Sequence, residues 1–131
     1  EMCIRDRRKL DPDTYRRSTA GDTLLMLMNA GRFHEAISEL SLQAQHPLFG
    51  SSANLSLSGT KFRPADIEPE ITSIADIVID HGLMKYHPWR ASSTLLDVET
   101  CTVHRFGSCY ENIADIMQRH FKVELPPKPA A

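Results

Sequence analysis

The chain has 131 residues, enough for one ordinary domain and too few for two. Its hydrophobic share of 41% is typical of a globular protein, and its net charge of -2 excludes nucleic-acid binding through bulk positive charge. The longest apolar run, residues 24–28, is far too short to cross a bilayer, so we expect no membrane association.

The chain opens with Glu1 rather than methionine, and residues 2–8 show no apolar periodicity. We expect residues 1–17 to be a non-native or disordered lead outside the fold. Basic side chains crowd this stretch, and we interpret them as a solvated end. They are Arg5, Arg7, Arg8, Lys9, Arg16 and Arg17.

Apolar residues at helical spacing predict two short helices, or one helix broken near Gly31, over residues 21–40. Pro47 stops the helical pattern, and residues 47–50 are then expected to form a short strand. Serine, asparagine and glycine dominate residues 51–60, which predicts an irregular loop.

Pro64 and Pro69 suit the first turns of helices, and residues 69–75 are predicted as a short helix. The β-branched run at residues 76–80 predicts a buried strand. Residues 93–98 and 101–105 predict two more strands, with a turn between them and an antiparallel pairing left open.

The last helix is expected to start at Gly107 and Ser108, because Ser108 and Glu111 have the spacing of a capping box. Apolar residues then recur on one helical face, and the prolines at 126, 127 and 129 predict a flexible tail over residues 123–131.

The three cysteines indicate a reducing, cytoplasmic compartment. Cys3, Cys101 and Cys109 form no C-x-x-C pair and are odd in number, which argues against a disulfide framework or a zinc site. The histidines show no metal-ligand spacing either, so we assign no metal-binding residue.

Alternating strands and helices predict an α/β domain, in which ligands bind at the carboxyl ends of strands. Ser52 and Asn54 would face one ligand if their backbone is extended, because side chains alternate along a strand. Arg105 stands near the end of the last predicted strand, where its guanidinium could clamp a phosphate beside Gly107. Taken alone, a loop rich in serine, asparagine and glycine more often has no ligand-binding role. A single arginine at a strand end more often forms a surface ion pair than binds a phosphate.

Four segments in order carry a family resemblance: residues 47–56, 76–82, 93–97 and 103–107. Together they resemble the second half of the YrdC-type family, the threonylcarbamoyl-AMP synthases. That half contains P-L-x-S-T-S-A-N-x-S-G, an acidic strand ending in D-G-G, a P-S-T-[VI]-V-D strand and an [IV]-x-R-P-G turn. The resemblance covers residues 18–122 and leaves the Pro-rich tail outside.

The resemblance implies a YrdC-like twisted sheet with flanking helices, truncated at its N-terminal side. It implies a nucleotidyltransferase that converts L-threonine, bicarbonate and ATP to threonylcarbamoyl-AMP and pyrophosphate, with Mg²⁺ on the phosphates, for tRNA modification. Ser52 and Asn54 would then hold the nucleotide phosphates, and Arg105 would pair with them. Ser93 and Thr94 would line the cleft toward nucleotide or threonine, and no catalytic residue is assigned.

Three departures from the family pattern matter. The K-x-R motif of the family's first half is absent, and the K-x-R of Lys61 and Arg63 follows the S-A-N element instead of preceding it. We therefore interpret these two cations as exposed loop residues. The S-A-N loop is two residues longer than in the family, and Phe106 replaces a proline.

These departures leave alternatives open. The chain is expected to be inactive alone and poorly soluble, because truncation leaves sheet edges unpaired. A non-catalytic module that binds nucleotide, tRNA or double-stranded RNA is the second hypothesis. An ordinary α/β interaction domain with a chance S-A-N is the third.

Overall fold

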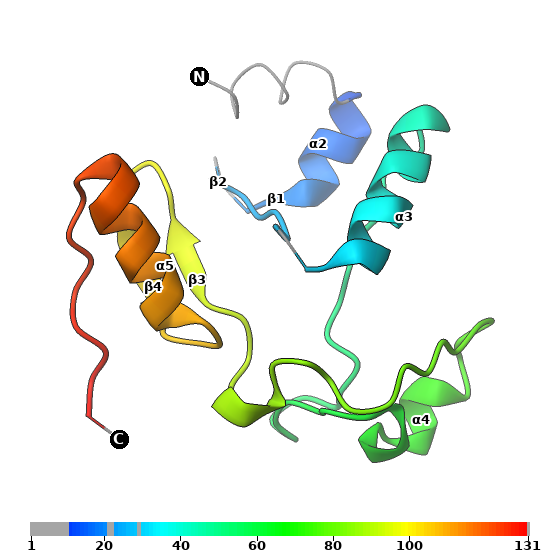
Figure 1. The fold of residues 1–131 in the computed structure, drawn as a ribbon. Coiled ribbons are helices and arrows are strands. Elements are labelled where there is room, and N and C mark those ends of the chain that lie inside the picture. Colours follow the sequence, from blue (N-terminus) through cyan, green and yellow to red (C-terminus); the bar gives the residue numbers. More distant parts are fainter. Residues whose placement is uncertain (1–10, 21–22, 29, 131) are drawn as a thin grey trace. The chain divides into compact units, whose positions relative to one another are not determined.

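The computed structural model describes residues 11–20, 23–28 and 30–130 (Figure 1). The chain divides into two compact units. The N-terminal unit is Glu1–Ser51 and the C-terminal unit is Ser52–Ala131. This division falls inside residues 18–122, which the sequence assigns to one domain. Residues 1–10 of the expected lead, with Cys3, and the expected helix start at residues 21–22 lie outside the described residues.

Part of the expected lead forms helix α2, Pro12–Ser18. The Asp11 side chain caps it by accepting hydrogen bonds from the N–H groups of Asp13 and Thr14, each at 3.1 Å. Pro12 occupies the first turn, where its missing N–H costs nothing. These local signals explain a helix where the sequence interpretation expected none.

The first of the two helices expected over residues 21–40 is wrong. Strands β1, Thr19–Ala20, and β2, Thr23–Leu24, pair antiparallel there, and residues 25–28 have no regular structure. The second is confirmed as α3, Arg32–Gln43. It begins after Gly31, whose φ of 100° lies in the region that favours glycine. The interruption of the apolar pattern at Gly31 therefore marks the start of this helix.

Two expected strands do not form. Residues 47–50 and residues 76–80 have no strand structure. Ile77, Val78 and Ile79 are 78%, 55% and 53% exposed, and no described strand pairs with them. A strand needs a neighbour to satisfy its backbone, so β-branched composition alone is not sufficient.

In the C-terminal unit, the two helix-starting prolines are confirmed by η1, Pro64–Asp66, and α4, Pro69–Thr72. A third short turn, η2, covers His87–Trp89. The predicted strand pair is also confirmed, with β3 at Leu95–Asp97 and β4 at Thr102–Arg105. The strands are antiparallel, and Leu96 faces Val103 in the register.

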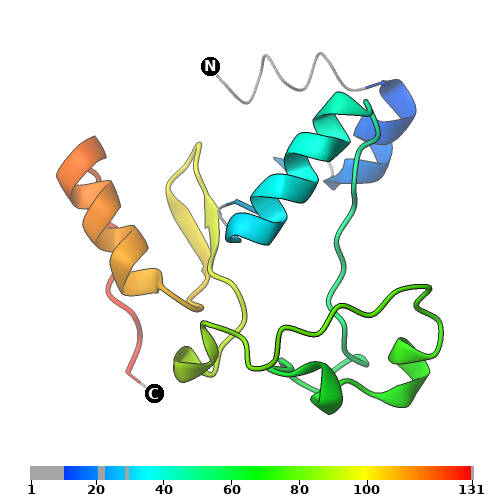
Figure 2. The ribbon, with the colours of Figure 1, turned by 45° about the vertical axis from the view of Figure 1, so that its right-hand side comes forward.

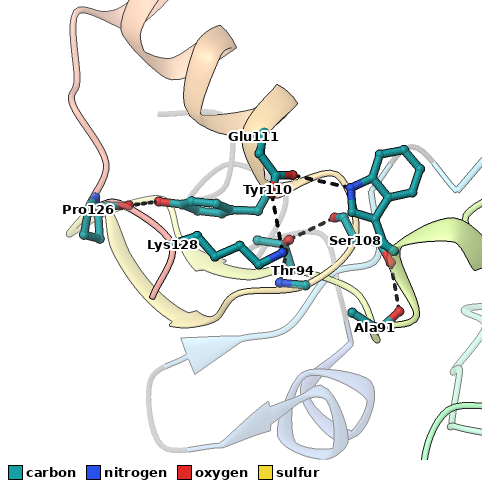
Figure 3. A network of polar contacts seen from close by, with 9 residues as sticks. Ala91, Thr94, Ser108, Tyr110, Glu111, Pro126 and Lys128 are labelled. Carbon is teal, nitrogen blue, oxygen red and sulfur yellow. Dashed lines mark hydrogen bonds and ion pairs between the residues drawn. The ribbon is translucent and has the colours of Figure 1, made fainter. Parts of the chain in front are cut away.

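A tight corner joins this hairpin to α5, Tyr110–Ile116, and its continuation η3, Met117–Phe121 (Figure 2). Figure 3 shows its contacts: the Ser108 hydroxyl donates to the Ala91 carbonyl at 2.8 Å, and the Thr94 hydroxyl donates to the Ser108 carbonyl at 3.0 Å. The expected capping box is therefore wrong. The N-cap is Cys109, without a side-chain cap, because the Ser108 hydroxyl is used across the corner.

The buried apolar side chains among the described residues are Tyr110 and Leu125, at 3% and 7% exposure. The Tyr110 hydroxyl donates to the Pro126 carbonyl, and the Phe106 ring meets the Tyr110 ring edge-on at 4.8 Å. Lys128 forms an ion pair with Glu111 at 3.4 Å (Figure 3). The tail expected to be flexible is thus held against α5.

Helices and short antiparallel strands are mixed in the described part of the chain, which is compatible with the α/β class. The strands there form two separate two-stranded ladders. Among the described residues, none of the helices has the length and hydrophobicity that a membrane span needs.

Candidate functional site

The C-terminal unit contains an open pocket of about 380 Å³. Its wall comes from residues 52–54, from residues 60–64 with Ile67, from Ile79, residues 81–82 and Met84, and from Ser92. Polar or basic side chains supply one part of the lining, and Phe62, Ile67, Ile79 and Met84 supply an apolar part. The polar and basic residues are Ser52, Asn54, Thr60, Lys61, Arg63, His81 and Ser92.

Backbone contacts fix the pocket wall. The Met84 N–H donates to the Phe62 carbonyl at 2.8 Å and so ties two wall segments that are distant in sequence. Gly82 turns the chain with a φ of 77°, and its N–H donates to the Asp80 carboxylate at 2.6 Å. These bonds bring the loop that carries Lys61 and Arg63 to the segment that carries His81.

The Leu55 carbonyl organises the Ser/Asn loop. It accepts from the Ser58 N–H at 3.0 Å, from the Ser58 hydroxyl at 2.9 Å and from the Asn54 side-chain amide at 2.9 Å. Leu57 lies within this turn with a φ of 68°, a conformation rare for a branched residue, and is fully exposed. One N–H of Asn54 therefore shapes its own loop, and its other amide groups remain for a ligand.

The two cations of this wall differ in their partners. The Lys61 ammonium lies 2.6 Å from the Glu68 carboxylate, and both side chains are about four-fifths covered, at 20% and 19% exposure. The hydrogen bond from Lys61 lowers the pKa of Glu68 to about 2. Arg63 is exposed and forms no ion pair with any described residue. No described Asp or Glu is part of the pocket lining, although the Asp80 and Glu68 carboxylates each bond to a lining residue.

The structure brings two of the expected site residues together, because Ser52 and Asn54 line the same pocket. Their backbone is bent there instead of extended, so period-two alternation is not the reason. Arg105 is not part of the lining. Its Nε–H donates to the Ser93 carbonyl at 2.8 Å, one residue from the pocket residue Ser92.

Ser93 and Thr94 belong to the corner before α5. Ser93 forms a parallel bridge with Ser108, and the Thr94 hydroxyl bonds the backbone at residues 107 and 108. Gly107 leaves room for a close approach, but the space is filled by the chain itself. A Cβ added there would lie 2.3 Å from the Ser92 carbonyl oxygen.

The interpretation of Lys61 and Arg63 as loop cations missed their place in the pocket. Their charge is visible in the sequence beside the Ser/Asn loop, but their position depends on the contact between Met84 and Phe62. Within residues 11–20, 23–28 and 30–130, no three His, Cys, Asp or Glu side chains gather as metal ligands.

No family model matches this chain, and neither does any curated protein or solved structure. Membership of the YrdC-type family therefore stays a prediction from the sequence. The chemistry of the pocket is the independent guide to function.

Proposed function

We propose that this chain is part of an ATP-dependent L-threonylcarbamoyladenylate synthase with a YrdC-like fold. The observation that carries the proposal is the shared pocket of Ser52 and Asn54, the two residues that the resemblance assigns to the nucleotide. The described lining also includes the basic residues Lys61 and Arg63, and it includes no Asp or Glu. A hydroxyl, an amide and cations are the donors that phosphate oxygens require.

In the proposed reaction, these groups orient the phosphates of ATP and stabilise the charge that develops on them. A carbamate oxygen of N-carboxythreonine attacks the α-phosphorus of ATP, and pyrophosphate leaves with the bonding electron pair. Ser52 and Asn54 would orient the phosphates, and the lining cations would offset the charge on the leaving pyrophosphate. The apolar part of the wall, which includes Phe62 and Met84, suits the less polar part of a nucleotide.

The pocket does not fit a Mg²⁺ ion held by protein carboxylates. Its side-chain oxygens are hydroxyls and one amide, and the nearby Glu68, whose Oε1 pairs with Lys61, is not part of the lining. Mg²⁺ sites in proteins commonly use one or two carboxylates together with substrate phosphates. We therefore assign no residue of this chain to the metal.

ATP binding measured by isothermal titration calorimetry on the 131-residue chain tests the proposal. Ser52→Ala and Asn54→Ala should each weaken ATP binding by about 10-fold, because each removes a hydrogen bond to a charged group. Ser56→Ala is the matched control, since Ser56 lies in the same loop but not in the pocket lining. Equal affinity of all four proteins for ATP would contradict the site.

Turnover separates a synthase from a simple binder. Pyrophosphate release that requires both L-threonine and bicarbonate is the expected activity of the complete enzyme. The 131-residue chain is expected to bind ATP without this release if further sequence is required. ATP hydrolysis that ignores threonine would contradict the synthase assignment.

The exposed Arg63 and the open pocket with its carboxylate-free described lining also support a second candidate, binding of tRNA or double-stranded RNA without catalysis. RNA binding of this kind should weaken steeply with salt and should survive Ser52→Ala. Fluorescence anisotropy with a labelled RNA duplex at two salt concentrations distinguishes it from ATP binding.

A further inference from the structure

We propose that Arg63, and not Arg105, is the arginine that contacts the anionic part of the pocket's ligand. This inference rests on the proposed nucleotide-binding function and specifies which cation serves it. The sequence favours Arg105, because it ends a strand, whereas the pocket geometry favours Arg63.

The surroundings of Arg105 give its guanidinium another task. Its Nε–H donates a hydrogen bond to the Ser93 carbonyl. In the hairpin, Arg105 pairs with Leu95, next to the register shift between Leu95 and Leu96. The side chain thus braces the open end of the β3–β4 hairpin, beside the corner before α5. It contributes no atom to the pocket lining.

Arg63 differs in its side chain, which makes no hydrogen bond or ion pair with any described residue, while its backbone is fixed. The Arg63 carbonyl accepts from the Asp66 N–H at 3.0 Å at the start of η1, and the preceding carbonyl, of Phe62, accepts from Met84. Arg63 is a lining residue of the pocket, and its exposed side chain has no ion-pair partner among the described residues. A guanidinium without an ion-pair partner, on a backbone fixed by hydrogen bonds, can donate two parallel hydrogen bonds to a phosphate.

The neighbouring cation does not compete for this role. Lys61 also lines the pocket, but its charge is offset by Glu68 at 2.6 Å. An anion that bound Lys61 would have to share it with this carboxylate, or separate a largely covered ion pair. Arg63 would bind an anion without separating an ion pair, because it has no ion-pair partner among the described residues.

Three charge-removing variants of the chain, R63Q, R105Q and K85Q, test the assignment. Lys85 is the matched control, because it is an exposed cation of the same unit that does not line the pocket. Calorimetric titrations would use ATP, inorganic pyrophosphate and adenosine as separate probes. Circular dichroism confirms that each variant keeps the wild-type helix content, which matters most for Arg105.

The expected result is that R63Q weakens both ATP and pyrophosphate binding by about 10- to 100-fold, while R105Q and K85Q change it by no more than about twofold. Adenosine affinity should not change in R63Q, because adenosine carries no phosphate. Loss of ATP or pyrophosphate affinity in a folded R105Q that equals or exceeds the loss in R63Q would overturn the inference.

The same titrations distinguish a failure of the synthase proposal from a failure of the Arg63 assignment. Wild-type protein that binds pyrophosphate but not ATP contradicts the synthase proposal, yet a loss of pyrophosphate binding in R63Q alone still supports the role of Arg63. Wild-type protein that binds neither anion overturns both.

Discussion

The corner before α5 makes Gly107→Ala the most informative stability variant. A Cβ at this position would lie 2.3 Å from the Ser92 carbonyl oxygen and 2.5 Å from the Thr94 nitrogen. Both contacts are with backbone atoms, so no side chain can move aside. The two segments must separate by about 1 Å to restore an ordinary contact of 3.4 Å.

That separation acts on the hydrogen bonds that close the corner. The Ser108 N–H donates to Ser92 at 2.8 Å, the Gly107 N–H donates to the Thr94 hydroxyl at 3.2 Å, and this hydroxyl donates to Ser108 at 3.0 Å. At about 1 kcal/mol for each of these bonds, their loss destabilises the unit by about 3 kcal/mol. The lower entropy of the unfolded alanine chain offsets about 0.4–1 kcal/mol of this, which leaves a net loss of about 2–3 kcal/mol.

Urea unfolding followed by tryptophan fluorescence measures this loss. Trp89 is the sole tryptophan, and its indole N–H lies 3.4 Å from Glu111 in α5, so it reports on this part of the molecule. Gly50→Ala is the control, because an added Cβ there meets no atom within 4 Å, and its stability should change by at most about 0.5 kcal/mol. Unfolding of Gly107→Ala at the wild-type urea concentration would refute the close packing of the corner.

Three further predictions concern single groups. Tyr110→Phe should lower the free energy of unfolding by about 1 kcal/mol in the same urea assay, because it removes the hydrogen bond to Pro126; no change would show that the tail is not held there. Leu57→Gly should raise the thermal midpoint, or leave it unchanged, because glycine relieves the positive φ, and a lower midpoint would contradict that conformation. Glu68 should stabilise the fold fully above its usual pKa of 4.5, and this stabilisation should be lost as the pH falls toward its lowered pKa of about 2; Glu68→Gln should flatten this part of the pH–stability curve.

The sequence predicted those elements that depend on neighbouring residues. The β3–β4 pair follows from two short stretches with apolar residues, Leu96 and Val103 among them, on both sides of a short turn. The Asp97 carboxylate closes that turn by accepting from the Glu99 N–H at 2.8 Å. Helices α3 and α5 follow from apolar periodicity. Helix α2 is predictable from Asp11 and Pro12, but the basic residues crowded around it favour the interpretation as a solvated lead.

The sequence could not predict features that depend on distant partners. Residues 76–80 have strand composition, but a strand exists only where another strand pairs with it. The capping-box pattern failed because the Ser108 hydroxyl bonds Ala91, seventeen residues away. The sequence predicted that Ser52 and Asn54 face one ligand from an extended backbone, whereas they line one pocket from a bent backbone. The places of Lys61 and Arg63 depend on a long-range backbone bond.

The unpaired aliphatic run at residues 77–79 has a consequence for hydrogen exchange. Its amides make no hydrogen bond with any described residue and lie in an exposed stretch, so they should exchange with solvent deuterium at nearly the rate of an unstructured peptide. The amides of β3 and β4 that form the ladder should exchange more slowly. A ligand or partner that gave residues 77–79 a neighbouring strand would be detected first as slower exchange in this short segment.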